Sequence, residues 1–234
     1  MTFNSNSSKP TPIWRFWVPM LFQTALILTV PAQAVYTQIT GKTVILQTVP
    51  VDPYELLRGY SQTLRYNISS QESLRRLPGW QNLPKLKPNG NKLTFIEPGT
   101  RLYVILAAPG EPALTKLPQA WKPVAVSLQR PSKLRPNQVA LQGLAQNGFI
   151  QYGLETYYIP EDQREQINAD LRAARLANPN QLQQTQSQTD PAQPQEIPPV
   201  VMEIKVNAQG DAVPVSLWAQ VGKASKQQVR NYRF

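Results

Sequence analysis

The sequence predicts a mainly β fold, an antiparallel sandwich or small barrel-like sheet with one or two helices, preceded by a single N-terminal transmembrane helix. Three observations support this prediction. Residues 16–35 are 20 amino acids without a charge, which as a helix would match the thickness of a bilayer core. Roughly eight short, β-branched or alternating segments follow, separated by turn residues. Beyond the anchor, an extended helical pattern appears only from residue 160 onward.

The composition excludes several classes of chemistry. The chain has 234 residues and contains neither Cys nor His. Ser-His-Asp and Cys-His catalysis, His or thiolate metal ligation and disulfide bonds are therefore excluded, and we expect no cofactor or metal. Acid–base chemistry would fall to Asp, Glu, Lys or Tyr. The net charge of +10 comes from Lys and Arg scattered along the chain, so we also expect no nucleic-acid partner.

The uncharged stretch 16–35 is the predicted transmembrane anchor. Lys9 and Arg15 precede it and no acidic residue does, so the positive-inside rule keeps residues 1–15 in the cytoplasm as a short head. Everything from Tyr36 onward then lies on the extracytoplasmic side, in the periplasm or its equivalent. The protein is expected to be a single-pass membrane protein.

A cleaved signal peptide is the competing interpretation of the same stretch. Residues 17–30 would be its apolar region, and residues 32–34 (Ala-Gln-Ala) fit the small-x-small cleavage rule. Pro19, Gln23 and Pro31 also make the stretch a mediocre spanning helix. The apolar run is longer than a signal peptide needs, which favours the retained anchor. Both interpretations export the domain.

Residues 52–69 predict a capped turn followed by a strand. Asp52 is a good helix N-cap and Pro53 suits the first helical position. Gly59 supplies the left-handed residue that ends the turn. From residue 60 to residue 69, polar and apolar side chains alternate, which is typical of a half-buried strand.

Further strands are predicted between turn signals. Asn147-Gly148 is the favoured pair for a two-residue type I′ turn, and it predicts a hairpin. Pro98-Gly99 is expected to separate two more strands. Residues 207–211, Asn-Ala-Gln-Gly-Asp, are expected to form the turn of a second hairpin, between the last two strands. A helix is expected to begin near Pro160-Glu161 and to end before Pro179. The expected strands beyond 60–69 cover residues 41–49, 92–97, 100–108, 121–129, 137–146, 149–160, 200–206 and 212–219.

Residues 177–199 interrupt this pattern of strands. They contain seven Gln, five Pro and no aromatic residue, so they cannot bury a core and are predicted to be a disordered insertion. The strands that follow belong to the same sheet, so residues 36–221 are one exported domain. Residues 222–234 follow as a basic tail without an acidic residue. We expect this tail to make a weak, salt-sensitive contact with anionic headgroups or with a partner.

The segment PVDPYELLRGYSQTLRY, residues 50–66, resembles the signature of the GDYXXLXY family, membrane-anchored bacterial proteins whose shared function is unknown. Tyr60 and Ser61 stand where that motif has its Asp and first Tyr, so the namesake pair is missing. A second block, residues 152–161, resembles the family's Tyr-Gly-x-Glu strand followed by Pro-Glu. The positions that carry the resemblance are Asp52, Pro53, Leu57, Arg58, Gly59, Leu64, Tyr66, Tyr152, Gly153, Glu155, Pro160 and Glu161.

The resemblance implies a single spanning helix, an exported β-rich domain and a partner that is a multi-pass membrane protein. With no convincing catalytic constellation in the sequence, we expect a non-enzymatic module that binds or assists another membrane or envelope protein. The alternative is a carboxylate-dependent hydrolase that uses Glu155 and Glu161. Nothing in the sequence fixes the separation of these two carboxyl groups, and structural roles account for both, such as Glu161 at a helix start.

Overall fold

The computed structural model describes residues 13–49, 61–63, 65–86, 94–110, 117–158, 169, 200–221 and 228–233. Three predicted features lie outside these residues. They are the capped turn at 52–59, the start of the helix at Pro160-Glu161 and the insertion at 177–199.

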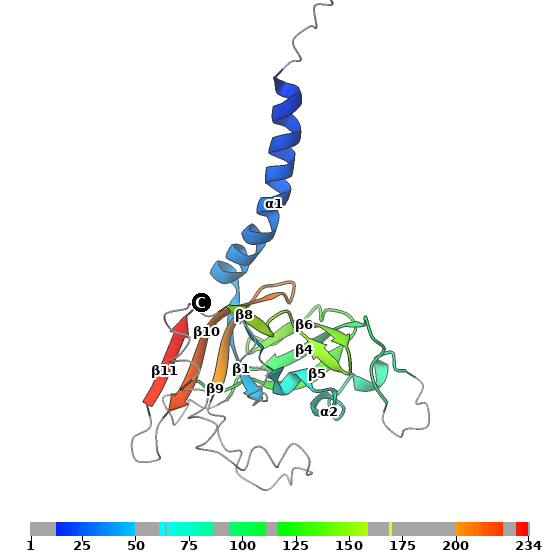
Figure 1. Cartoon of the computed structure of the whole chain (residues 1–234). Coiled ribbons are helices and arrows are strands. Elements are labelled where there is room, and N and C mark those ends of the chain that lie inside the picture. Colours follow the sequence, from blue (N-terminus) through cyan, green and yellow to red (C-terminus); the bar gives the residue numbers. More distant parts are fainter. Residues whose placement is uncertain are drawn as a thin grey trace, which may run out of the picture.

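Most of the N-terminal helix α1 (Trp14–Thr40) projects away from the β-rich domain, and its C-terminal end meets β9 and β10 (Figure 1). It is long and apolar enough to cross a membrane, and it runs five residues beyond the predicted anchor. Pro19 and Pro31 lie inside it. Each Pro removes a backbone hydrogen bond and crowds the preceding turn, which accounts for the bend in Figure 1.

The first sheet has five strands in the order β11-β10-β9-β1-β3, and every neighbouring pair is antiparallel. Lys42, the first residue of β1, pairs with Val206, which in turn pairs with Ala212. These three residues mark the end of the sheet that lies next to α1, which ends at Thr40. The strands are β1 (Lys42–Val49), β3 (Arg65–Tyr66), β9 (Val200–Val206), β10 (Ala212–Val221) and β11 (Gln228–Arg233).

The second sheet has four antiparallel strands in the order β5-β4-β6-β7. They are β4 (Arg101–Ala107), β5 (Lys122–Ser127), β6 (Gln138–Gln146) and β7 (Phe149–Gln151). A separate antiparallel pair joins β2 (Ser61–Thr63) to β8 (Thr156–Tyr158). Three short helical turns complete the described part of the domain: η2 (Asn67–Ser69), α2 (Gln71–Leu74) and η3 (Trp80–Asn82).

A single main core lies between the two sheets. It takes apolar side chains from one face of each sheet, and most of them are almost completely buried. The predicted mainly β, antiparallel fold behind an N-terminal helix is therefore confirmed, and the described strands form two packed sheets rather than a closed barrel. Representative core residues are Val44, Leu46, Met202, Ile204 and Leu217 from the first sheet and Leu102, Val104, Leu106, Leu141 and Ile150 from the second.

Both predicted hairpins are confirmed. Asn147 and Gly148 have φ angles of 51° and 79°, the two left-handed values that a type I′ turn requires, and they join β6 to β7. In β9, the alternating residues Val200, Met202, Ile204 and Val206 are all buried in the core, as the pattern predicts. Residues 207–211 then turn the chain into β10.

The predicted continuous strand at 60–69 is wrong, because the chain changes partner along it. β2 pairs with β8, β3 pairs with β1, and residues 67–69 form the turn η2. The described residues therefore belong to two short strands with different partners, and the second ends at Tyr66, where η2 follows.

In the described part of the predicted strand at 92–97, residues 94–97, the β pairing is one isolated bridge, between Lys85 and Ile96. The side chain of Gln71 in α2 accepts the N–H of Ile96, and the side chain of Arg75, just after α2, donates to the carbonyl of Thr94. In a strand these backbone groups would bond to a neighbouring strand.

Two further segments differ from the prediction. Residues 152–155 are not strand: Gly153 has φ 73°, and the carboxylate of Glu155 takes the backbone N–H of Tyr152. The basic tail at 222–234 contains β11, which pairs with β10 over six residues. Backbone hydrogen bonds to β10 hold this segment, so it adds a fifth strand at the edge of the first sheet.

Candidate functional site

The described residues of the two motif blocks meet in the core. The hydroxyl of Tyr66, in the first block, donates to the backbone carbonyl of Leu154, in the second block, at 2.7 Å. The hydroxyl of Tyr152 donates in the opposite direction, to the carbonyl of Ile68, also at 2.7 Å. We call Tyr66 and Tyr152 the tyrosine clasp. The exposed fractions of their side chains are 1% and 7%, so water does not compete for either hydrogen bond.

Backbone pairing reinforces the contact between the two blocks. β2 aligns with β8 in a short ladder, and Ser70 bridges to Phe149. The guanidinium carbon of Arg65 lies 4.9 Å from the centre of the Phe149 ring, which is a cation–π contact. Segments about 90 residues apart in the sequence are thus joined by backbone, hydroxyl and ring contacts.

Burial determines the chemistry of Tyr152. Removal from water raises the pKa of its hydroxyl well above the ordinary value of about 10, and the negative charge of Glu155 raises it further. The hydroxyl therefore stays protonated at neutral pH and acts as a hydrogen-bond donor.

Glu155, the half-buried acid of the second block, closes a turn. Its Oε1 accepts the backbone N–H of Tyr152 at 2.6 Å, across the left-handed Gly153. A carboxylate that satisfies a backbone donor in this way has a structural role. Glu161 lies outside the described residues, and so does the separation of the two carboxyl groups that the hydrolase alternative depends on. The other predicted positions outside the described residues are Asp52, Pro53, Leu57, Arg58, Gly59, Leu64 and Pro160.

A second polar cluster joins α1 to the domain, and we call it the helix junction: Gln33, Thr37, Asn207 and Asp211. The amide nitrogen of Asn207 donates to Oγ1 of Thr37 at 3.0 Å and to the carboxylate of Asp211 at 3.2 Å. Gln33, one helical turn earlier, donates to the same carboxylate at 3.1 Å. Thr37 is 1% exposed and Asn207 is 8% exposed, so the centre of the junction is dry.

The turn that carries Asn207 is itself firmly held. The side-chain oxygen of Asn207 accepts the backbone N–H groups of Gln209 and Asp211, at 2.9 and 3.0 Å. The carbonyl of Gly210 then accepts the N–H of Gln142 in β6, at 2.9 Å. One five-residue turn thus connects α1, the first sheet and the second sheet.

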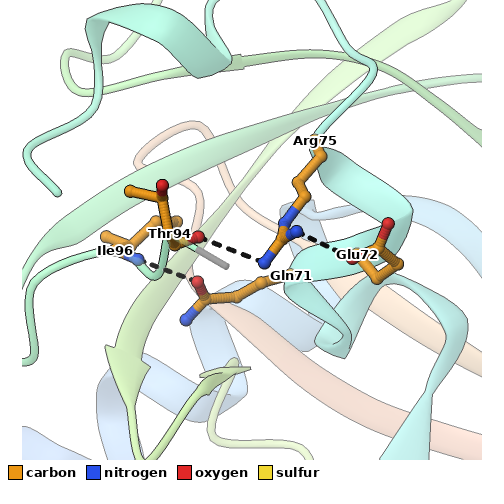
Figure 2. A network of polar contacts seen from close by, with 5 residues as sticks. All are labelled: Gln71, Glu72, Arg75, Thr94 and Ile96. Carbon is orange, nitrogen blue, oxygen red and sulfur yellow. Dashed lines mark hydrogen bonds and ion pairs between the residues drawn. The ribbon is translucent and has the colours of Figure 1, made fainter. Parts of the chain in front are cut away.

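A third cluster fixes the segment around Ile96 (Figure 2). Oε1 of Gln71 accepts the N–H of Ile96 at 2.8 Å, and Arg75, one turn later, donates to the carbonyl of Thr94 at 3.1 Å. Arg75 also pairs with Glu72 at 3.1 Å. In the described part of the chain, the buried Nε2 of Gln71 and Nε of Arg75 have no acceptor. The arrangement acts as a clamp on a backbone segment.

Sequence reasoning missed the helix junction and the Gln71–Arg75 clamp. The residues 207–211, Asn-Ala-Gln-Gly-Asp, predicted a turn, and an Asn that bonds the backbone two residues on is a known turn signal. Nothing in the sequence indicated that the same amide would also reach Thr37. Among the described residues, no group of three or more Asp or Glu could hold a metal ion.

These features define a class of protein: a β-rich domain of two antiparallel sheets, carried on an N-terminal apolar helix and tied together by the two motif blocks. The chain belongs to the GDYXXLXY family, because its residues 23–217, most of its length, match the family described as GDYXXLXY protein. The resemblance of the two motif blocks is thereby confirmed. No curated protein and no solved structure matches the chain.

Proposed function

We propose that this protein is a single-pass membrane protein whose extracytoplasmic domain is held beside another membrane protein, which it binds or assists. In this proposal α1 spans the bilayer and also provides the contact within it. The N-terminus lies in the cytoplasm, because Lys9 and Arg15 precede the uncharged span and no acidic residue does.

The single observation that carries the proposal is Gln23. Within the predicted span it lies about 10 Å from the start and about 4 Å from the midpoint. Its side chain is exposed, and no described residue hydrogen-bonds to its amide. Thr24 and Thr29, by contrast, donate to carbonyls of their own helix, at 2.9 and 2.8 Å. A free amide in hydrocarbon is costly, and a neighbouring transmembrane helix with a polar side chain would relieve that cost.

The helix junction supports the proposal because it makes the anchor part of the fold. Thr37 and Gln33 bond to the turn between β9 and β10, so a partner that fixes α1 in the membrane also fixes the domain above it. A simple tether would leave the domain free to turn on its linker. The junction also extends the helix past Ala34, the residue after which a signal peptidase would cut.

The first prediction tests Gln23 in the full-length protein. Gln23→Leu should lower the amount of partner that co-purifies in mild detergent by about 3- to 30-fold, since a hydrogen bond between membrane helices contributes about 0.6–2 kcal/mol. Thr24→Val is the matched control, because it removes a polar group that is already satisfied within the helix. The amount of protein in the membrane should be the same for both variants.

Photo-cross-linking identifies what lies against this face. A photoreactive residue at position 27, about 40° around the helix from Gln23, should give an adduct with another membrane protein. The same residue at position 25, about 200° away, should not. An adduct only with a second copy of this chain would replace the proposal by self-association, and an unchanged co-purified yield for Gln23→Leu would contradict it.

A further inference from the structure

The loop between β5 and β6 lies on the side of the domain where α1 arrives. We call residues 128–137, LQRPSKLRPN, the basic loop. Near its end, the carbonyl of Pro136 accepts a hydrogen bond from the ammonium group of Lys42, which begins β1 two residues after α1 ends. The same ammonium lies 5.4 Å from the centre of the Trp121 ring. Lys42 thus fixes the end of the loop beside the helix.

The start of the basic loop is also near the helix junction. Ser127, the residue before the loop, pairs with Tyr103 in β4. The ring of Tyr103 packs against the β9–β10 turn, because a Cβ built on Gly210 would lie 3.0 Å from its Cε1. Both ends of the loop therefore adjoin elements that meet α1.

The distance from the bilayer is short. From residue 35, the end of the predicted span, to Thr40 the helix rises about 7.5 Å. The headgroup layer on each side of the hydrocarbon core is about 5–8 Å thick. The junction and the basic loop beside it therefore lie at the level of the headgroups when α1 spans the membrane.

The composition of the basic loop fits that level. Arg130, Lys133 and Arg135 are exposed, and the loop has no acidic residue. Leu128 and Leu134 are also exposed, at 41% and 37%. Basic residues interleaved with exposed apolar side chains are the pattern of surfaces that sit in a membrane interface. Asp211 in the helix junction adds one negative charge against the three positive charges of the loop, so the balance of charge stays positive.

We propose that the basic loop is a lipid contact: Arg130, Lys133 and Arg135 bind anionic headgroups of the membrane that α1 spans, and they set the tilt of the domain on it. This inference rests on the membrane span proposed above and goes beyond it, because it assigns a second, electrostatic attachment to the domain itself.

The C-terminal tail is less suited to this contact than the sequence indicated. Across the first sheet, Arg233 pairs with Ser216, Ser216 pairs with Glu203, and Glu203 pairs with Ile45. Ile45 lies three residues along β1 from Lys42, on the side away from α1. Arg233 is thus about 10 Å farther from the membrane, at about 3.3 Å per residue. At physiological salt the screening length is about 8 Å, so a charge at that distance contributes little to binding of the headgroups.

The test uses the full chain in vesicles, with a fluorophore on Ser132→Cys. The chain has no other Cys, so the label is unique. In vesicles with 30% anionic lipid, a quencher carried on the headgroups should quench this label at 0.1 M salt. Quenching should fall at 1 M salt and in neutral vesicles, because the screening length drops from about 10 to about 3 Å.

Two charge variants decide the cause. K133Q/R135Q should reduce quenching to the level of neutral vesicles, since each basic residue near an anionic surface changes the local equilibrium about fivefold. R65Q/R233Q removes the same charge from two exposed positions of the first sheet, Arg65 opposite Val49 at the far end of β1 and Arg233 on β11, and should leave quenching unchanged. Equal quenching in neutral and anionic vesicles, or for all variants, would overturn the lipid contact. A chain that fails to float with the vesicles would instead overturn the membrane span.

Discussion

The hydroxyl of Tyr66 donates to the carbonyl of Leu154 in the second motif block, and the hydroxyl of Tyr152 donates to the carbonyl of Ile68, two residues after the first block. A buried carbonyl that loses its donor pays the desolvation cost without compensation, so each hydroxyl contributes more than its packing alone. This explains why a Tyr, rather than a Phe, suits both positions. The clasp assigns the described motif residues a role in holding the two blocks together.

At the residue scale we predict a pH effect carried by Tyr152. Tyr152→Phe should lower the free energy of unfolding by about 1 kcal/mol at neutral pH, through loss of the bond to Ile68. Above about pH 10 the unfolded chain loses this proton while the folded chain keeps it, because burial raises the folded pKa. The wild type should therefore lose up to about 1.4 kcal/mol per pH unit from this group as the pH rises through that window.

Denaturant unfolding of the full-length protein in detergent, followed by Trp fluorescence between pH 7 and 11, measures this difference. The gap between wild type and Tyr152→Phe should be constant up to about pH 10 and should close above it. Tyr103→Phe changes a half-buried Tyr in β4, outside the tyrosine clasp, and serves as the control. A gap that stays constant to pH 11 would mean that the folded pKa is not raised.

At the scale of elements, the helix junction couples α1 to both sheets through one turn. Asn207 holds the turn with its side-chain oxygen and holds the helix with its side-chain nitrogen. The two tasks are separable because they use different atoms. A variant on the helix side alone should therefore loosen α1 without unfolding the turn.

Thr37→Val is that variant. It keeps the shape of the side chain and removes the oxygen that accepts from Asn207, whose amide still reaches Asp211. We expect limited proteolysis between residues 36 and 41 to become several-fold faster, because a local opening no longer costs this buried bond. The denaturation midpoint of the domain should change little. Asn207→Ala, which also releases the turn, should speed this proteolysis and also lower the denaturation midpoint. Equal proteolysis of wild type and Thr37→Val would show that the bond between Asn207 and Thr37 does not hold the helix.

The elements also show which features a sequence can reveal. The Asn147-Gly148 turn and the alternation at 200–206 were predictable because neighbouring residues decide them. The breaks at 60–69 and 92–97 depend on distant side chains. Tyr66 reaches a carbonyl 88 residues away, and Ile96 gives its N–H to Gln71. In the candidate site, the motif positions Tyr66 and Tyr152 were predicted, but their mutual contact was not, because spacing along a chain does not specify which backbone carbonyl a hydroxyl meets.

At the scale of the whole molecule, one end of the domain gathers everything that would meet a membrane. α1, the β9–β10 turn and the basic loop lie together there. The first sheet extends away from that end. If α1 spans a bilayer, this end of the domain faces the membrane and the opposite end points away from it. The orientation of the protein across the membrane can therefore be tested.

We predict that residues from Tyr36 onward are extracytoplasmic and that α1 is retained. Protease added to intact spheroplasts should degrade the domain, because the charges before the span, Lys9 and Arg15, stay inside. Digestion only in inverted vesicles would reverse the orientation. N-terminal sequencing of the mature protein separates anchor from signal peptide, since cleavage after Ala34 would leave Val35 first. Cleavage would also remove Gln33 and its bond to Asp211, so a retained N-terminus is the outcome that keeps the helix junction whole.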